Sequence, residues 1–296
     1  MTDLRPRRSA LYMPGANERA LEKAKTLPAD ALILDLEDAV APEAKPAARE
    51  RVCAAVASGE YGRRELTIRV NGLDTPWHDE DLRAAAKAGP DAVVVPKVNS
   101  AADVHAVERV LEQAGAPDRT RIWAMVETPV AILHAKEIAA ASSRLTVLVM
   151  GTNDLAKELQ AQHVPGRAPL LTGLSLCLLA ARAYGKQILD GVYNDVKDLD
   201  GFAAECRQGR EFGFDGKTLI HPGQLEPCNQ AFSPSEAEIE RSRRIIAAFE
   251  EATARGDGVV TVDGRMIENL HVDDARRLLA LGVLLAPPSA SRLGPS

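Results

Sequence analysis

The chain has 296 residues, of which 46% are hydrophobic and 26% are charged, and its net charge is −6. This composition suits one large globular domain, or one such domain with a small appendage. The net negative charge argues against a nucleic-acid surface as the main function, because such surfaces are basic. An anionic ligand would therefore need a local cluster of cations.

Neither a membrane segment nor a secretory signal is predicted. The longest apolar run, residues 278–286, is far too short to span a bilayer. The basic residues near the N-terminus are followed by a mixed polar sequence rather than an apolar stretch. The cysteines lie far apart and lack metal or redox spacing, which is typical of reduced thiols in a cytosolic protein. We therefore expect a cytoplasmic protein that does not act at a membrane.

Short apolar runs predict eight strands, at residues 9–13, 31–36, 66–70, 92–95, 122–126, 145–150, 187–191 and 217–220. Helices are predicted between nearly every pair, at residues 17–27, 43–57, 79–88, 102–114, 131–141, 173–184 and 198–212, with an irregular segment at 156–171. Such β/α alternation predicts a parallel sheet covered by helices. The number of strands favours a closed (β/α)8 TIM barrel over an open sheet, and we assign this barrel to residues 1–230.

Residues 231–296 are predicted to form a C-terminal helical extension. A capping box at Ser233–Glu236, with Pro234 at the first helical position, begins a charged helix that runs to residue 254. A short hairpin at 259–264 and a helix at 272–281 follow. Because this segment has too little apolar sequence for a core of its own, we predict a lid that folds onto its own barrel mouth or a neighbour's.

Two of the predicted strands carry a carboxylate just past their ends. Glu127 follows the strand at 122–126, and Asp154 follows the strand at 145–150. A strand–helix–strand unit makes these strands parallel neighbours, so both carboxylates emerge on the same rim. Two hard oxygen ligands, with water completing the shell, are the usual way in which proteins hold Mg²⁺. The sequence therefore predicts a divalent ion that anchors a small oxyacid here, although each acid could instead cap the helix after it.

The other predicted strands also end in polar side chains, which in a barrel face the active site. Arg69 could grip a carboxylate with two hydrogen bonds, or form a structural ion pair with Glu37 or Asp38. Lys97 could be a solvated charge, and His221 could be a hydrogen-bonded structural histidine. Further residues of this rim are Tyr12, Asp35, Asn71, Asn153, Asp190 and Asn194.

One turn of the first predicted helix separates Arg19 from Lys23, so the two side chains share a face. They are either the solvated side of this helix or, with Arg7 and Arg8, a cationic patch for an anionic cofactor. In the tail, Glu268 and His271 are expected at the surface. Neither a Gly-x-Gly-x-x-Gly nor a Gly-x-Ser-x-Gly motif occurs.

Seven motifs occur in order between Arg8 and Pro222, and the resemblance that they carry spans about residues 5–280. They are Arg8-Ser9-x-Leu11-x-x-Pro14-Gly15, Asp35-Leu36-Glu37-Asp38-Ala39-Val40 with Lys45 and Ala48-Arg49, Ile68-Arg69-Val70-Asn71-Gly72, Val95-Pro96-Lys97, Val126-Glu127-Thr128-Pro129, Gly151-x-Asn153-Asp154-Leu155, and Gly216-Lys217-x-x-Ile220-His221-Pro222. Together they resemble the citrate lyase β-subunit-like branch of the HpcH/HpaI aldolase superfamily. Malyl-CoA and citramalyl-CoA lyases belong to this branch.

This resemblance implies a Mg²⁺-dependent barrel enzyme, with Mn²⁺ as an alternative metal, that assembles as a trimer or hexamer. Glu127 and Asp154 match the metal ligands, and with Arg69 and Asn153 they match the substrate-binding set. Positions that contact coenzyme A are matched by Tyr12, Arg19, Lys23, Ile220 and His221. The family's lid carries an aspartate in a Met-Ile-Asp motif, whereas this chain has Met266-Ile267-Glu268, an acid that is one methylene longer.

The implied reaction cleaves, or forms by condensation, a 3-hydroxyacyl-CoA such as malyl-CoA or citramalyl-CoA, with a 2-oxo acid and an acyl-CoA as products. Arg69 would stabilise charge on the oxyacid. Glu37 and Asp38 would hold a metal-bound water or orient Arg69, and Glu268 would shuttle a proton. Three alternatives stay open: a thioesterase of the malyl-CoA hydrolase type, an aldolase of free 2-keto-3-deoxy acids, and a citrate lyase β subunit that works on a carrier-bound citryl thioester.

Overall fold

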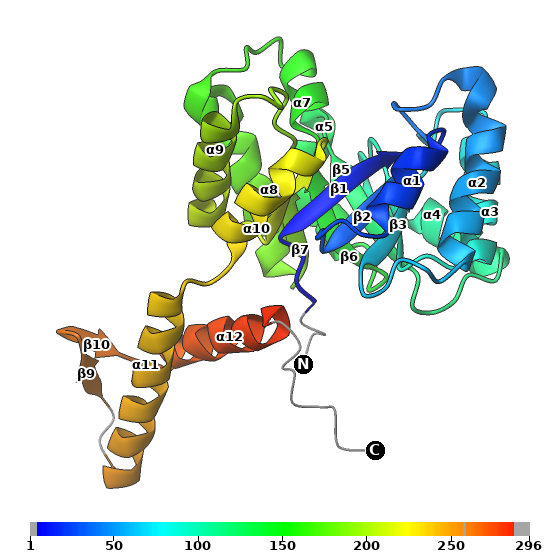
Figure 1. The fold of residues 1–296 in the computed structure, drawn as a ribbon. Helices are drawn as coiled ribbons and strands as arrows, with labels where there is room; N and C mark the ends of the chain where they lie inside the picture. The colour runs from blue at the N-terminus through cyan, green and yellow to red at the C-terminus, as the bar shows by residue number, and fades with distance from the viewer. Residues whose placement is uncertain (1–4, 257–258, 287–296) are drawn as a thin grey trace, which may run out of the picture. The chain divides into compact units, whose positions relative to one another are not determined.

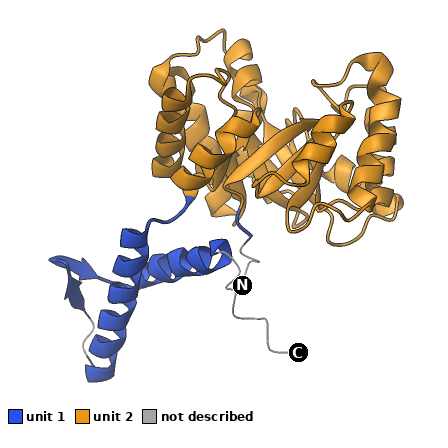
Figure 2. Ribbon diagram, in the orientation of Figure 1, with its two compact units in different colours: residues 1–6, 233–296 blue, residues 7–232 orange. Residues whose placement is uncertain are grey.

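The computed structural model describes residues 5–256 and 259–286, which fall into two compact units (Figure 2). One unit comprises residues 7–232, and the other comprises residues 233–296 together with residues 1–6. The predicted domains, residues 1–230 and 231–296, include residues 1–4, 257–258 and 287–296, which lie outside the described residues.

The larger unit is a closed barrel of parallel strands, as the sequence predicts (Figure 1). Its strands are β1 (Ser9–Pro14), β2 (Ala31–Asp35), β3 (Glu65–Arg69), β4 (Ala92–Val95), β5 (Arg121–Val126), β6 (Leu145–Met150), β7 (Gln187–Asp190) and β8 (Gly216–Leu219). Spatial order follows chain order, and pairing of β1 with β8 closes the ring. Because every strand runs in the same direction, all their carboxyl ends meet at one rim.

Helices follow the strands and cover the barrel (Figure 1). They are α1 (Glu18–Ala24), α2 (Lys45–Ala57), α3 (His78–Ala88), α4 (Ala101–Gln113), α5 (Pro129–Leu133), α6 (Ala135–Ala140), α7 (Thr152–Glu158), α8 (Leu171–Ala183), α9 (Leu199–Phe212) and α10 (Leu225–Phe232), with 3₁₀ turns η1 (Pro42–Ala44), η2 (Pro165–Leu170) and η3 (Pro222–Gln224). The single helix predicted at 131–141 is wrong, because His134 leaves helical geometry between α5 and α6. The segment at 156–171 is less irregular than predicted, since it contains the end of α7 and η2.

Two apolar layers hold this unit together. Alternate strand residues point into the barrel, where alanines such as Ala10 and Ala92 leave room for the fully buried Trp123. The residues between them pack outward against the helices. At the amino ends of the strands, the Arg7 guanidinium lies 5.4 Å from the centre of the Trp123 ring and pairs with Glu65 at 2.6 Å. This arrangement closes the barrel at the end opposite the rim.

The smaller unit consists of α11 (Glu236–Arg255), the hairpin β9 (Val260–Val262) and β10 (Arg265–Ile267), and α12 (Asn269–Leu285). Its capping box uses Ser235 and Glu238, two residues later than predicted. The expectation that it lacks a core is also wrong, because it buries a small apolar cluster: Ile245, Ile267, Val272 and Ala275. Met266 and Leu270 remain 59% and 62% exposed in the described structure.

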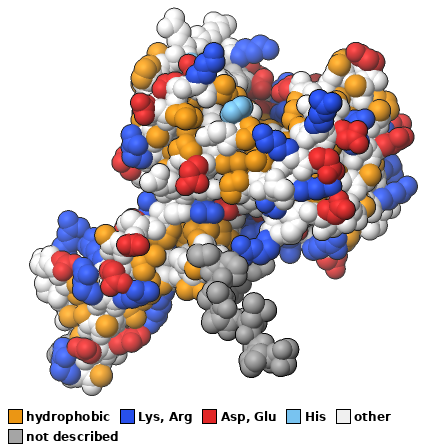
Figure 3. Space-filling model, in the orientation of Figure 1, with side chains coloured by type: hydrophobic (Ala, Val, Ile, Leu, Met, Phe, Trp, Pro, Cys, Tyr) orange, Lys and Arg blue, Asp and Glu red, His pale blue; other side chains and the backbone are white. Residues whose placement is uncertain are grey.

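Charged side chains on the face shown in Figure 3 are mixed in sign rather than gathered into one basic area. Within residues 5–256 and 259–286, none of the helices combines the length and the apolar character that crossing a bilayer requires.

A buried charge network joins β7 and β8 to α9 and η2. Asp190 accepts a hydrogen bond from Arg167 Nη1 at 2.7 Å and lies 3.0 Å from Lys217 Nζ. Lys217 also donates to Glu205 Oε1 at 2.6 Å. Burial by itself would raise the pKa of Asp190, but the charges of Lys217 and Arg167 together outweigh burial and lower it. Asp190 therefore stays ionised, and the two cations in this network balance its two carboxylates.

Replacing Asp190 by asparagine should destabilise the fold by about 3–5 kcal/mol, because two buried cations lose their shared partner. The depressed pKa of Asp190 contributes stability that is present above the ordinary aspartate pKa and is lost as the pH falls through the lower native value. In urea unfolding, the penalty should be complete at pH 7 and begin to shrink below about pH 4. Asp200→Asn, on the exposed side of α9, is the control and should change stability little. An equal penalty at pH 7 and pH 3 would contradict this prediction.

Candidate active site

Acidic side chains gather at the carboxyl ends of the strands. Asp35 is the last residue of β2, and Glu37 and Asp38 follow it directly. Glu127 follows β5, while Asp154 lies in the first turn of α7, after β6. The residues that lead up to these strand ends are apolar and buried, so the polar side chains begin at the rim.

Arg69, the last residue of β3, is 8% exposed and lies among three of these acids. Its Nε and Nη2 atoms each donate to an oxygen of the buried Asp35 at 2.6 Å. Its Nη1 atom lies 2.7 Å from Glu37 and 3.4 Å from Asp38. One edge of the guanidinium is therefore fixed by a buried carboxylate, and the remaining nitrogen faces the more exposed acids.

Tyr12 lies inside the barrel beside this arginine. The Arg69 guanidinium carbon is 4.7 Å from the centre of the Tyr12 ring, a cation–π geometry. Burial raises the pKa of the Tyr12 phenol, and although the Arg69 charge opposes this effect the hydroxyl stays protonated at neutral pH. Tyr12 therefore lies beside the charged cluster, apart from the exposed residues of α1 that are also predicted to contact coenzyme A.

The Glu127 carboxylate is held from two sides. Its Oε1 atom accepts a hydrogen bond from the backbone N–H of Lys97 at 2.7 Å. On the other side lies Gly151, where a Cβ atom would stand only 2.1 Å from Glu127 Oε2. The carboxylate therefore fits only because residue 151 is a glycine. Since Oε1 is already bonded, Oε2 is the oxygen left for a ligand.

Neither candidate metal ligand caps a helix. Thr128 caps α5 through a 3.0 Å hydrogen bond from Ala131 N to its hydroxyl, which leaves Glu127 out of this role. The residue before α7 is Gly151, so Asp154 already lies within the first turn. Asn153 instead exchanges two side-chain hydrogen bonds with Asn194, at 3.0 and 2.8 Å, which tie the loop after β6 to the loop after β7.

The cluster carries more negative than positive charge. When ionised, its five carboxylates face two cations, Arg69 and Lys97. The pKa of Glu37 is raised to about 8, chiefly by burial and in smaller part by neighbouring acids, against the pull of Arg69. Burial likewise raises the pKa of Glu127 to about 7; the Lys97 N–H opposes this shift, while Asp154 adds to it. Such mutual repulsion is relieved by a bound cation.

A divalent ion fits this cluster as a partly open site. In the part of the chain that the structure describes, no three or more acidic, histidine or cysteine side chains converge as a complete cage. Mg²⁺ commonly uses one or two carboxylates and keeps water or substrate oxygens as its other ligands. Glu127 Oε2 and the half-buried Asp154 supply hard oxygen donors of this kind.

Sequence reasoning overlooked how the loop after β2 is anchored. Lys45, at the start of α2 and 6% exposed, donates from Nζ to the carbonyl oxygens of Leu36 and Glu37, both at 2.9 Å. It also donates to Asn71 Oδ1 at 2.6 Å. The only sequence signal was its place in a motif with the acids, because the period of a helix does not show that a lysine points inward.

The residues predicted to contact coenzyme A occupy two neighbouring strand ends. Arg19 and Lys23 are exposed on α1, which follows β1, and Ile220 and His221 are exposed after β8. Since β1 pairs with β8, the two pairs belong to adjacent parts of the rim. The prediction that Arg7 and Arg8 join Arg19 and Lys23 in one cationic patch is wrong. Arg7 and Arg8 precede β1 and pair with Glu65 and Asp30 at the other end of the strands.

His221 has a structural role in the described chain. Its Nδ1 atom accepts a hydrogen bond from Gly223 N at 3.0 Å, and Gln224 Oε1 accepts from the backbone of Ile220 and His221. Glu268 belongs to the smaller unit, where its backbone N–H donates to His271 Nδ1 at 3.0 Å and its side chain is exposed. Its part at the site remains a prediction.

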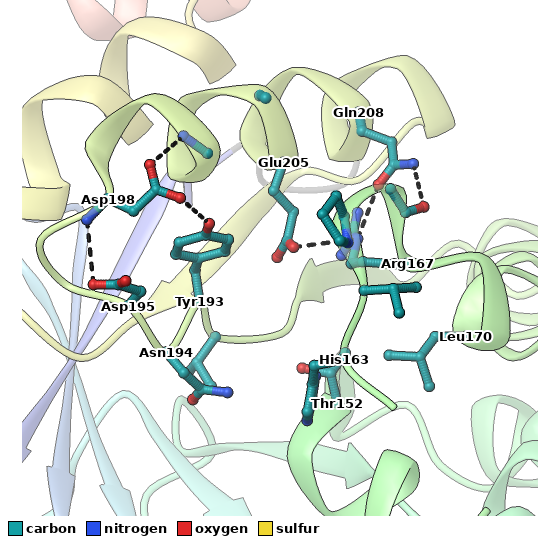
Figure 4. A pocket seen from close by; sticks show the side chains of 16 residues that line it. Thr152, His163, Arg167, Leu170, Tyr193, Asn194, Asp195, Asp198, Glu205 and Gln208 are labelled. Carbon is teal, nitrogen blue, oxygen red and sulfur yellow. Dashed lines mark hydrogen bonds and ion pairs between the residues drawn. The ribbon is translucent and has the colours of Figure 1, made fainter. Parts of the chain in front are cut away.

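A cavity of about 450 Å³ lies beside the rim, between α9, the loop after β7 and the segment leading into η2 (Figure 4). Tyr193 and Asp198, joined by a 2.6 Å hydrogen bond, lie on one side, and Arg167 and Gln208 lie on the other. None of the residues that line it comes from the acidic cluster, although Thr152 stands close to Asp154 in sequence. The candidate active site is therefore defined by its charges rather than by this cavity.

Comparison with known proteins identifies the family of the chain. The family profile described as HpcH/HpaI aldolase/citrate lyase matches residues 8–222. The chain is 55% identical to a (3S)-malyl-CoA thioesterase of Cereibacter sphaeroides, over 97% of this chain and 98% of that protein. It is 38% identical to the citrate lyase subunit beta of Escherichia coli K12, over 93% of each chain.

Solved structures show the same fold. Protein CitE from Mycobacterium tuberculosis, in complex with magnesium, acetoacetate and coenzyme A, superposes with a TM-score of 0.77 at 30% identity, over 96% of this chain and 100% of that one. A citrate lyase from Burkholderia xenovorans, at 21% identity, shares the fold with a TM-score of 0.84, over 98% of this chain and 95% of that one. Motifs, barrel and relatives agree, and the chain belongs to the HpcH/HpaI aldolase/citrate lyase family.

Proposed function

We propose that this protein is a Mg²⁺-dependent enzyme that hydrolyses malyl-CoA or a closely similar 3-hydroxyacyl-CoA thioester. One observation carries the proposal: the chain is 55% identical to a (3S)-malyl-CoA thioesterase over 97% of its length. The unbalanced carboxylates beside Arg69 support it, because they suit a divalent ion next to a group that binds carboxylates. The sequence motifs alone favoured a carbon–carbon lyase, which remains the second candidate.

The chain supplies the ligands and the charge partners for the oxyacid end of the substrate. When bound, Mg²⁺ (or Mn²⁺ in its place) supplies a Lewis acid at this end. Glu127 and Asp154 would hold the ion, with Lys97 N–H fixing one oxygen of Glu127. Arg69 Nη1 would exchange its contacts with Glu37 and Asp38 for the substrate carboxylate, while Asp35 keeps the guanidinium in place.

Coenzyme A is proposed to lie along the neighbouring part of the rim. Tyr12, which borders the charged cluster, would separate the oxyacid from the thioester arm. Arg19 and Lys23 are exposed cations that suit the phosphates of the cofactor. Ile220 and His221 offer an exposed apolar and ring surface after the adjacent strand. Protein CitE, a relative at 30% identity, binds coenzyme A together with magnesium.

Hydrolysis requires water to bond to the thioester carbon while the carbon–sulfur bond breaks. One proton leaves the water and one reaches the departing sulfur, so a carboxylate that shuttles protons is needed. Glu268 is the proposed shuttle, brought by the tail of the same chain or of a neighbour in a trimer or hexamer. The exposed Met266 and Leu270 beside it suit a segment that covers another surface.

Carbon–carbon cleavage is the second candidate, because the chain is also 38% identical to a citrate lyase subunit beta. Here the 3-hydroxyl loses its proton, and the bond between carbons 2 and 3 breaks. Its electron pair forms the enolate of an acyl-CoA, which takes up a proton at carbon, and a 2-oxo acid is released. The same residues would hold the oxyacid, so the two reactions differ in the bond that breaks rather than in the site.

Glu127→Gln and Asp154→Asn should each weaken Mn²⁺ binding at least tenfold, because each removes one of two anionic ligands. Free Mn²⁺ is counted by electron paramagnetic resonance, and circular dichroism checks the fold. Glu158→Gln, exposed at the end of the same helix as Asp154, should bind Mn²⁺ as the parent does. Parent-like affinity in both ligand variants would place the metal elsewhere.

Gly151→Ala should impair metal binding although neither candidate metal ligand is substituted. Its new Cβ would lie 2.1 Å from Glu127 Oε2 and 2.3 Å from Glu127 Cβ, so the glutamate must move. Gly173→Ala is the matched control, because a Cβ there has ordinary contacts from 3.4 Å outward. Calorimetric titration with Mg²⁺ should show weaker binding in the first variant only, and equal affinity in both would speak against the placement of Glu127.

The products of malyl-CoA distinguish the two reactions. Hydrolysis yields free coenzyme A and malate, whereas cleavage yields glyoxylate and acetyl-CoA. We expect free thiol to appear without glyoxylate in the presence of Mg²⁺, and neither product to form after chelation. Glu268→Gln should slow thiol release by about 10²–10⁴-fold if it shuttles protons, with the substrate KM little changed. Stoichiometric glyoxylate would establish the lyase instead.

A further inference from the structure

The residue after β4 has a backbone conformation that side chains disfavour. Lys97 has φ +51°, in the left-handed region that only glycine enters without steric cost. Strained residues of this kind persist when the surrounding structure demands them, and they cluster at functional sites. The question is therefore what a lysine does here that a glycine could not.

Hydrogen bonding by the backbone does not answer it. The conformation aims the Lys97 N–H at Glu127 Oε1, 2.7 Å away, and the next N–H, of Val98, donates to Met125 O at 3.2 Å. Glycine would adopt the same φ at lower cost and present the same N–H. The reason for a lysine must lie in its side chain.

That side chain is an exposed cation beside the acidic cluster. The carboxylates whose charges act most strongly on it are those of Asp154, Glu37 and Glu127. Even so, the ammonium group forms no ion pair with any residue of the described chain. Arg69, by contrast, is committed to Asp35 through two nitrogens. Lys97 is thus the cation of this cluster that a ligand can reach without displacing a partner.

Both candidate reactions place negative charge on one atom that has no partner so far. Water addition to the thioester turns its carbonyl oxygen into an oxyanion, and cleavage of the carbon–carbon bond turns the same oxygen into an enolate oxygen. Arg69, Glu127 and Asp154 are assigned to the oxyacid at the other end of the substrate. A donor aimed at the charge that develops in the transition state is the usual way in which enzymes lower such a barrier.

We propose that Lys97 is a catalytic residue whose ammonium group donates a hydrogen bond to the thioester oxygen as negative charge develops there. This role rests on the proposed function, and it holds for hydrolysis and for cleavage alike. It also explains why the chain keeps a lysine in a conformation that suits glycine, since the side chain must start from this rim position, beside Glu127, to reach the substrate.

The test compares Lys97→Met, Lys97→Arg and Lys97→Gly with the parent and with Lys136→Met, an exposed lysine on α6. Lys97→Met should lower kcat with malyl-CoA and Mg²⁺ by about 10²–10³-fold, as the loss of one oxyanion donor does. Its KM and its Mn²⁺ affinity should stay within threefold of the parent, because the Lys97 N–H to Glu127 remains. Lys97→Arg should recover part of kcat, and Lys136→Met should match the parent.

Lys97→Gly gives a readout that a structural role cannot imitate. It should lose kcat as Lys97→Met does, yet melt at the same temperature as the parent or higher, because the strain is relieved. If the parent is active and the kcat of Lys97→Met lies within threefold of it, the role of Lys97 is overturned while the proposed function stands. A loss of Mn²⁺ affinity that matches the loss of kcat would overturn this role as well. A parent that leaves malyl-CoA unchanged would overturn the proposed function and this role with it.

Discussion

Uncompensated negative charge at the carboxyl ends of β2, β5 and β6 is the constraint on which this structure depends. Inside the fold, the carboxylates of Asp190 and Glu205 are balanced by Arg167 and Lys217, so this network needs no further cation. At the rim, Arg69 and Lys97 face five carboxylates, and the pKa values of Glu37 and Glu127 are raised first by burial and then by the neighbouring acids. A cluster of the first kind is costly to break, whereas the second kind is the basis of the metal site proposed above.

The barrel makes this unfavourable cluster persist by fixing each member from outside it. Asp35 holds Arg69, the Lys97 N–H and the missing side chain of Gly151 place Glu127, and Lys45 anchors the loop that carries Glu37. Each of these supports comes from the chain itself. Preorganisation of this kind makes charged groups effective in catalysis, because little reorganisation is needed during the reaction.

Relatives with different reactions fit the same physical scheme. A thioesterase at 55% identity and a citrate lyase subunit at 38% identity both match this chain over more than nine-tenths of its length. In the proposed site, holding an oxyacid and stabilising a thioester oxygen serve both reactions. The choice between breaking the carbon–sulfur bond and breaking the carbon–carbon bond then falls to the group that moves protons, for which the tail residue Glu268 is the candidate.

The sequence by itself determined the barrel, its strand ends and the acids at them, because buried parallel strands leave continuous apolar runs that stop where the rim begins. It also determined the family, through motifs that lie at those strand ends. Only the tertiary structure decided that Asp35 is the main partner of Arg69, that Tyr12 stacks beside it, that Arg7 closes the opposite end, and that Lys97 is left-handed. These features depend on side-chain direction and on contacts between distant segments, which the period of a strand or helix does not encode.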